Sequence, residues 1–262
     1  MTSARRPSLK SRIRRGELTI GSWLSFGFTP ISEMMASSGF DWLVVDMEHT
    51  GIDSADAMAM IQVVDLAGCV PLVRVGANDP LLIKRALDAG AHGVVVPMVN
   101  SRQDAERAAS ATFYAPRGQR GAGLSRAQRY GLGFAEYKTW ADEETVLIVQ
   151  IEHIEAVGNL RSIMAVDGVD AFIVGPYDLS GSLGRPGDWN HPSVVEALNE
   201  VRNVASSEGI MGGYHVVHSD RMELDRRLHE GYRLIAYGDD MVFLAEKLQQ
   251  EASWLADLRA QH

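Results

Sequence analysis

The chain of 262 residues contains a single cysteine and no apolar run long enough to span a bilayer. One cysteine excludes a disulfide framework within the chain, which favours a reducing, cytoplasmic location. Cys69 lies among apolar neighbours in AGCVPLV and is expected to be a small buried filler rather than a nucleophile. No low-complexity tract or linker divides the sequence, so a single domain is predicted over residues 1–262.

Basic residues are fewer than acidic ones: the chain has 25 Lys and Arg but 34 Asp and Glu. The net charge of −9 and the sequence pI of about 5.4 disfavour the phosphate attraction on which nucleic-acid binding relies. The Arg-rich start, MTSARRPSLKSRIRRGE, has no apolar core region and is therefore not a secretory signal. A transit peptide is an alternative, but the segment from about Ser8 to Arg15 favours a short helix that leads into the domain. No membrane partner is expected.

Short apolar runs alternate with segments of helical periodicity along the whole chain. Most runs are continuously apolar, as is typical of strands that are covered on both faces. They occupy residues 19–25, 41–46, 70–75, 93–98, 145–152, 170–175, 210–217 and 232–238. Eight strand-then-helix units in this length predict a (β/α)₈ TIM barrel. A doubly wound open sheet is the alternative, although GSWLSFGF after the first run lacks the G-x-G-x-x-G pattern.

The helical segments carry recognisable end signals. Ser54 and Asp79 are expected N-caps, Pro80 suits a first helical turn, and Gly68 and Gly90 suit helix ends. The longest stretch without such signals runs from Ala115 to Glu144. Long irregular loops in compact domains tend to be functional, and we expect this one to lie over the barrel mouth.

In a barrel of this kind the active site gathers at the carboxyl ends of the strands. Polar residues at those ends form a sizeable set: Trp23, Ser25, Asp46, Glu48, His49, Arg74, Gln150, Glu152, Asp178, His215, His218, Asp239 and Asp240. Glu152 and Asp178 follow successive strands, and two neighbouring carboxylates repel unless a cation lies between them or one stays protonated. Oxygen ligands alone suit Mg²⁺ or Mn²⁺. The alternative is that Glu152 caps the next helix and Asp178 makes a turn.

Two further positions suggest chemistry. His49 follows Asp46 in VVDMEH, which suits a general base whose tautomer a carboxylate fixes; a solvated surface turn is the alternative. Arg74 lies on the apolar strand PLVRVG, where burial is costly unless the guanidinium meets an anion. That anion is either a substrate carboxylate or enolate, or one of the same acids in a structural salt bridge.

Lysine positions exclude one mechanism. The lysines, Lys10, Lys84, Lys138 and Lys247, lie neither within the eight apolar runs nor just after them. A Schiff-base mechanism requires a desolvated lysine in the barrel. The sequence therefore favours metal-assisted enolate chemistry over Schiff-base chemistry.

Taken together, GFDWLVVDMEH, PLVRV, GAHGVVVPMVNS, APRGQRGAG, VQIEHIEAVGNL and GVDAFIVGPYDLSGSLG resemble the HpcH/HpaI class II pyruvate aldolase family, from about Gly21 to Val217. The resemblance implies reversible cleavage of a 4-hydroxy-2-oxo acid to pyruvate and an aldehyde, with Mg²⁺, Mn²⁺ or Co²⁺ as cofactor. It also implies a homohexamer, a trimer of dimers with swapped C-terminal helices.

By motif, the resemblance implies metal ligation by Glu152 and Asp178 and contact of Arg74 with the 2-oxo group. His49 paired with Asp46 would handle protons, and Asp88 would reach into a neighbouring subunit's site. The predicted substrate-binding residues are Trp23, Gln150, Gly175, Pro176 and Asp178. The region GLSRAQRYGLGFAEY and the segment after Ile210 depart from the family pattern, so the aldehyde is not identified.

Three alternatives remain open at this point. Related barrels of the family join enolates to other acceptors in citrate-forming, oxaloacetate-decarboxylating or acyl-CoA lyase reactions. A non-catalytic barrel that binds a small acid belongs to a different class. A phosphosugar isomerase is disfavoured because the last two strands lack a Gly-Ser-rich phosphate loop, although MGG at residues 211–213 leaves some room.

Overall fold

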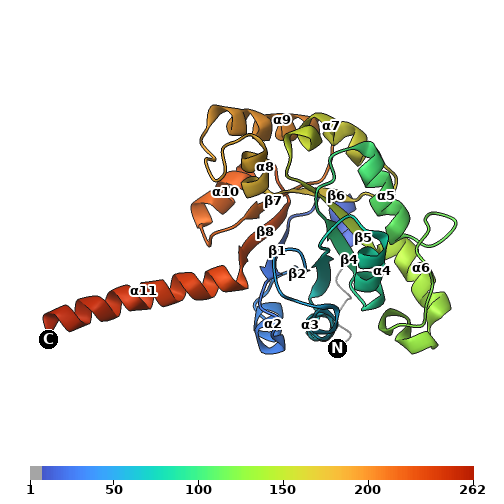
Figure 1. Ribbon diagram of the computed structural model, residues 1–262, viewed down its shortest axis with the longest axis horizontal. Coiled ribbons are helices and arrows are strands. Elements are labelled where there is room, and N and C mark those ends of the chain that lie inside the picture. Colours follow the sequence, from blue (N-terminus) through green and yellow to red (C-terminus); the bar gives the residue numbers. More distant parts are fainter. Residues whose placement is uncertain (1–7) are drawn as a thin grey trace.

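Eight parallel strands close into a barrel in the computed structural model, which describes residues 8–262 (Figure 1). Each strand pairs with its neighbours in sequence, and β8 pairs with β1 to close the barrel. The strands are β1 Thr19–Leu24, β2 Trp42–Asp46, β3 Val70–Arg74, β4 Gly93–Val96, β5 Val146–Ile151, β6 Ala171–Val174, β7 Gly212–Val216 and β8 Leu234–Asp239. Their ends differ from the predicted runs by no more than two residues, which confirms the predicted (β/α)₈ barrel.

Helices cover the outside of the barrel. They are α2 Thr29–Ala36, α3 Ser54–Leu66, α4 Pro80–Asp88, α5 Arg102–Thr112, α7 Ile154–Met164, α8 Pro176–Ser182, α9 Pro192–Glu208 and α10 Arg221–His229. Asp79 caps α4 as predicted, since its carboxylate accepts the backbone N–H groups of Leu81 and Leu82. The N-cap of α3 is Asp53 rather than Ser54, because the Asp53 carboxylate accepts the backbone N–H groups of Ala55 and Asp56.

The strands bury side chains on both faces, as a barrel requires. Alternate residues point inward and fill the barrel, among them Trp42, Leu72 and Ile148. The intervening residues pack outward against the helices, among them Leu43 and Val73. This alternation decides which side chains at the strand ends face the barrel axis.

A short helix closes the amino-terminal end of the barrel. This helix, α1 Leu9–Arg14, has Ser8 as its N-cap, in agreement with the predicted lead-in. Its Lys10 is fully buried and donates to the Thr145 carbonyl at 2.6 Å and to Asp170 at 3.0 Å. Because Thr145 and Asp170 immediately precede β5 and β6, Lys10 lies at the opposite end from the mouth. The exclusion of a Schiff-base lysine therefore holds for Lys10 despite its burial.

The prediction for residues 115–144 is wrong in two respects. The segment contains a 3₁₀ helix, η1 Arg126–Gly131, and a regular helix, α6 Phe134–Glu144. It also runs to the amino-terminal side of the barrel: Trp140 contacts His92, just before β4, with ring centroids 4.9 Å apart. An apolar spacing in FAEYKTWADEE, which buries Tyr137 and Ala141, accounts for α6.

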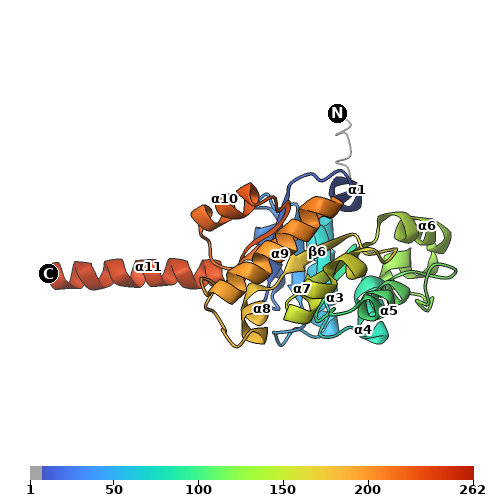
Figure 2. The same cartoon turned by 90° about the horizontal axis from the view of Figure 1, so that it is seen from above.

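The C-terminal helix, α11 Asp240–Gln261, projects away from the barrel (Figures 1 and 2). It exposes several apolar side chains, including Leu248 and Trp254. No helix within residues 8–262 is both long enough and apolar enough to cross a membrane. Cys69 is buried as predicted, and burial raises the pKa of its thiol to about 12.

Candidate active site

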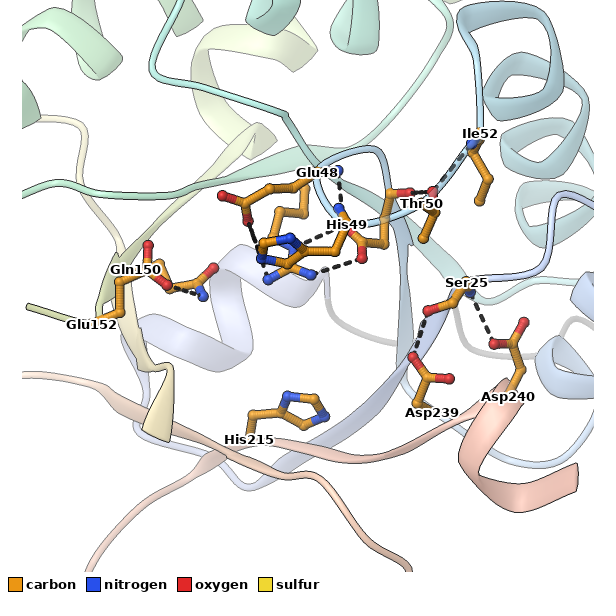
Figure 3. Close-up of polar contacts among 12 residues, drawn as sticks. Ser25, Glu48, His49, Thr50, Ile52, Gln150, Glu152, His215, Asp239 and Asp240 are labelled. Carbon is orange, nitrogen blue, oxygen red and sulfur yellow. Dashed lines mark hydrogen bonds and ion pairs between the residues drawn. The ribbon is translucent and has the colours of Figure 1, made fainter. Parts of the chain in front are cut away.

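Six side chains predicted from the strand ends converge at the carboxyl end of the barrel. On each strand they continue the inward-facing row: Asp46 follows Trp42 and Val44, and Glu152 follows Ile148 and Gln150. The other inward-facing members are Trp23, Arg74 and His215. Figure 3 shows Gln150, Glu152, Glu48, His49 and His215 around this mouth. The strand-end rule therefore locates the candidate site correctly.

Arg74 and Asp46 form the central ion pair of the site. The strands place these residues side by side in register, and Arg74 donates from Nε to Asp46 Oδ1 at 2.8 Å and from Nη2 to Oδ2 at 2.7 Å. Burial acts to raise the pKa of the Asp46 carboxyl, but the Arg74 hydrogen bonds hold it below its ordinary value. The guanidinium also lies over the Trp23 ring, 4.5 Å from its centroid. Arg74 is thus held by Asp46 and Trp23, and its Nη1 faces the Glu48 carboxylate at 3.2 Å.

The predicted pairing of the Asp46 and His49 side chains is not formed in the described structure. Both Asp46 oxygens bind Arg74, and Oδ1 also accepts the Glu48 backbone N–H. His49 lies beyond the strand with 63% of its side chain exposed, and its Nε2 is 3.7 Å from Glu48 Oε2. The carboxylate beside His49 is therefore that of Glu48, because the tight turn after β2 turns the imidazole away from Asp46. A catalytic role of His49 stays a prediction.

Glu152 is a buried acid in an environment that disfavours its charge. It is 3% exposed, and its Oε1 accepts the Met98 N–H at 2.7 Å while Gln150 Nε2 donates to Oε2. Burial, with the nearby Glu48 and Asp178 carboxylates, raises the pKa of Glu152 to about 7. Glu152 does not cap the next helix, since His153 is the N-cap of α7. The helix-cap alternative for Glu152 is therefore excluded.

The turn after β6 brings the second predicted metal ligand to the same place. Asp178 is exposed in the first turn of α8, and its carboxylate raises the pKa of both Glu152 and Glu48. A Cβ at Gly175 would lie 2.8 Å from Gln150 Nε2 and 3.0 Å from Glu152 Oε2, so glycine leaves these two side chains in place. Pro176 begins α8 and is buried at the mouth. The turn therefore packs directly on the two functional side chains of β5.

The donor set suits a hard divalent cation, although residues 8–262 contain no group of three His, Cys, Asp or Glu side chains positioned to bind one. Gln150 Oε1 is a buried oxygen atom that accepts no hydrogen bond within that range, and the buried Glu48 Oε2 has only ion-pair contacts, with Arg74 and His49. Mg²⁺ typically takes one or two protein carboxylates and completes its shell with water and substrate oxygens. Glu152 and Asp178, with oxygen-rich surroundings, fit that requirement.

Asp88 lies outside this site within the single chain. It is the last residue of α4, away from the mouth, and its carboxylate accepts a hydrogen bond from Arg120 at 2.7 Å. A role in a neighbouring subunit's site stays a prediction.

Two contributors were not assigned a role from the sequence. Glu48 contacts Arg74 Nη1 at 3.2 Å, and burial raises the pKa of its carboxyl. The sequence signal that could have indicated a role for Glu48 is its position two residues after the inward-facing Asp46. Asp240, just after β8, is buried and accepts the backbone N–H groups of Ser25 and Phe26, which fixes the loop after β1.

A sequence model described as HpcH/HpaI aldolase/citrate lyase matches residues 20–246. This chain belongs to that family. Among its relatives, the 2-dehydro-3,6-dideoxy-6-sulfogluconate aldolase of Pseudomonas putida is 37% identical over 91% of this chain and 92% of the relative. The hydroxypyruvate/pyruvate aldolase of Sagittula stellata (strain ATCC 700073 / DSM 11524 / E-37) is 36% identical over 94% and 96%.

Solved structures agree with this assignment. The family protein from Burkholderia cenocepacia J2315 has a TM-score of 0.89 and 36% identity, covering 95% of this chain and 98% of that one. The citrate synthase SbnG has a TM-score of 0.85 and 26% identity, with coverage of 97% and 99%. As a member of this family with aldolase relatives over most of its length, the chain is a carbon–carbon lyase of the aldolase type.

Proposed function

We propose that this enzyme is a divalent-metal-dependent aldolase that reversibly cleaves a 4-hydroxy-2-oxo acid to pyruvate and an aldehyde. The observation that supports this most directly is Glu152, whose pKa burial and the nearby Glu48 and Asp178 carboxylates raise to about 7, close to the guanidinium of Arg74. A cluster of acids beside a fixed cation suits binding of a cation together with an anionic substrate.

Glu152 and Asp178 would hold Mg²⁺ or Mn²⁺, with Co²⁺ as a further candidate. When bound, such a cation supplies positive charge that polarises a 2-oxo carbonyl and favours the enolate over the keto form. Gln150 holds Glu152 in place through its amide N–H and lies where the pyruvate end of the substrate would bind.

Arg74 contributes a fixed positive charge at the 2-oxo group. Two hydrogen bonds to Asp46 and the Trp23 ring below it hold the guanidinium in place. Little reorganisation is therefore required when negative charge develops on the substrate oxygen. The burial of Trp23 at this point also keeps water from one side of the guanidinium.

His49 would take the proton from the C4 hydroxyl during cleavage, directly or through a water molecule. Its side chain is exposed at the mouth, and Glu48 Oε2 is the nearest carboxylate to its Nε2. In the synthetic direction the same imidazole would return the proton to the newly formed alkoxide.

Substitution of Arg74 tests the proposal. Removal of one preorganised charge donor costs about 3–4 kcal/mol in comparable sites, so Arg74→Ala should lower kcat for cleavage by roughly 10²–10³-fold with the fold intact. Arg102→Ala, on the exposed face of α5, is the matched control. Metal-reconstituted enzyme is assayed with a panel of 4-hydroxy-2-oxo acids. Near-normal turnover of Arg74→Ala would contradict the assignment.

A second candidate is a synthase of the same enolate chemistry. The likeness to the citrate synthase SbnG favours it, since that protein covers nearly all of this chain. Assays with oxaloacetate and an acyl-CoA distinguish it from an aldolase. A non-catalytic acid-binding barrel is distinguished by metal-dependent proton exchange at the methyl group of pyruvate, which a binding protein would not catalyse.

We also propose that the enzyme assembles as a homohexamer through α11. The apolar side chains that α11 exposes, including Leu248 and Trp254, support burial against another copy of this chain. Light scattering coupled to size-exclusion chromatography, on the full chain and on Trp254→Glu with Leu248→Glu, measures the assembly directly. A monomeric full chain would contradict it.

A further inference from the structure

A pocket with a basic lining lies on the outside of the barrel, between the neighbouring helices α4 and α5 (Figure 1). It has a volume of about 380 Å³. Helix α4 contributes Lys84, α5 contributes Arg107 and Ser110, and the segment after α5 contributes Gln119 and Arg120. None of the residues of the catalytic mouth lines this basic pocket, so it is separate from the site of the proposed chemistry.

The lining of the basic pocket carries three cations and, in the described part of the chain, no acid. These cations are Lys84, Arg107 and Arg120, in a chain whose net charge is −9. Acids outside the lining offset two of them in part: Asp88 contacts Arg120 at 2.7 Å, and Asp104 lies 3.7 Å from Arg107. The Lys84 ammonium has no partner within residues 8–262. Positive charge gathered in one place on an acidic protein favours an anionic occupant.

Arg120 is the fixed cation of the basic pocket. Its side chain is fully buried, and its Nη2 donates to Asp88 at 2.7 Å and to the Tyr137 hydroxyl at 3.1 Å. The guanidinium carbon also lies 4.5 Å from the centre of the Tyr114 ring. Nε and Nη1 have no hydrogen-bond partner among the described residues. Burial of a guanidinium without a full set of acceptors is costly, and an anion beside it offsets that cost.

The remaining polar side chains of the basic pocket are also free to donate. The Ser110 hydroxyl and the Gln119 side-chain amide make no hydrogen bond within residues 8–262. The Gln119 backbone N–H donates to the Ser110 carbonyl at 2.6 Å, which ties the segment after α5 to that helix. Ammonium, guanidinium, hydroxyl and amide groups all donate to phosphate oxygens. A phosphate group offers three acceptor oxygens to donors from several directions, whereas a carboxylate offers two in one plane.

We propose that the basic pocket between α4 and α5 binds a small phosphate-bearing anion at a site separate from the catalytic mouth. Lys84 and Arg107 would contact the phosphate group from the two helices, and Arg120 supplies a fixed positive charge behind it. A volume of about 380 Å³ is within the range of small-molecule sites, so a phosphate ester fits as well as the free ion. The proposal does not depend on the proposed aldolase function.

Titration calorimetry of the full chain after treatment with a chelator measures binding without metal and without turnover. The probes are inorganic phosphate, glycerol 3-phosphate and malonate, which carries its negative charge on two carboxylates. The unmodified protein should bind both phosphates more tightly than malonate. Tighter binding of glycerol 3-phosphate than of inorganic phosphate would favour an ester as the natural occupant, and the reverse order would favour the free ion.

Lys84→Ala should weaken phosphate binding at least about tenfold, because it removes a charged hydrogen-bond donor to the anion. The double substitution Lys84→Ala with Arg107→Ala should weaken it further. Lys138→Ala, on an exposed position of α6, removes the same charge elsewhere and should leave the affinity unchanged. Arg74→Ala should also leave it unchanged, since Arg74 belongs to the catalytic mouth. Thermal unfolding verifies that each variant is folded.

The proposal is overturned if the unmodified protein binds neither phosphate, or if Lys84→Ala binds both as tightly as the unmodified protein does. Loss of binding in Arg74→Ala with full binding in Lys84→Ala would place the anion at the catalytic mouth instead. Binding of malonate that is as tight as that of the phosphates would overturn the assignment to a phosphate group.

Discussion

Substitution of Glu152 by Gln should stabilise the metal-free enzyme, and the gain should grow with pH. Glu152 is 3% exposed, and its pKa rises from the ordinary 4.5 to about 7 because burial and two neighbouring carboxylates disfavour its charge. The folded state therefore keeps this proton up to about pH 7, whereas the unfolded state releases it near pH 4.5. Between those values the folded state binds more protons, so the free energy of unfolding falls as the pH rises.

The magnitude follows from the size of the shift. The difference between 7 and 4.5 is about 2.5 units, and each unit corresponds to about 1.4 kcal/mol, so the ionised form costs about 3.5 kcal/mol in full. The cost is about 1 kcal/mol at pH 5 and approaches its full value at pH 8. Glutamine cannot ionise and keeps a similar shape, so Glu152→Gln escapes the cost.

Urea unfolding of chelator-treated protein at several pH values from 5 to 8 measures the effect. The difference in the free energy of unfolding between Glu152→Gln and the unmodified protein should widen by about 2.5 kcal/mol over that range. Glu155→Gln, an exposed acid in the first turn of α7, should show no such widening. A constant difference for Glu152→Gln would refute the account of its environment.

Two other substitutions test the remaining ion pairs. Asp46→Asn should lower kcat for cleavage at least tenfold, because an amide offers only one acceptor to the two N–H groups of Arg74. Steady-state kinetics measure this, and an unchanged kcat would contradict the role of the pair. Lys10→Met should cost about 3 kcal/mol in urea unfolding since it leaves Asp170 buried without its cation, and Lys10→Met with Asp170→Asn should recover most of that loss.

The barrel was predictable because its strands are buried on both faces, which leaves continuous apolar runs in the sequence. The helix α6 was missed for a different reason. It follows a Gly-rich segment, and its five apolar residues are no more numerous than its five charged ones, so its helical pattern is weak. Its location could have been deduced from topology alone, since a helix that directly precedes β5 must end at the amino-terminal side of the barrel.

The members of the candidate site were predictable, whereas their pairings were not. The sequence places Asp46, Arg74 and Glu152 at the carboxyl ends of strands, where a barrel gathers its active site, and the alternation along each strand turns all three inward. Which acid meets Arg74 depends on the register of β2 and β3, which sets Asp46 directly beside it. His49 lies past the end of β2, where alternation no longer applies, and the turn geometry places it against Glu48 instead.

The charges in the mouth link metal affinity to pH. Asp46 and Glu48 share the single charge of Arg74, so the four acids Asp46, Glu48, Glu152 and Asp178 carry more negative charge than this one cation offsets. A proton on Glu152 and a divalent cation relieve the same repulsion at the same oxygen atoms, and they therefore compete. Affinity for Mn²⁺, measured by titration calorimetry, should rise with pH up to about 7 and level off above it, because Glu152 has by then lost its proton. In Glu152→Gln the affinity should be weak at every pH; tight binding by that variant would place the cation elsewhere.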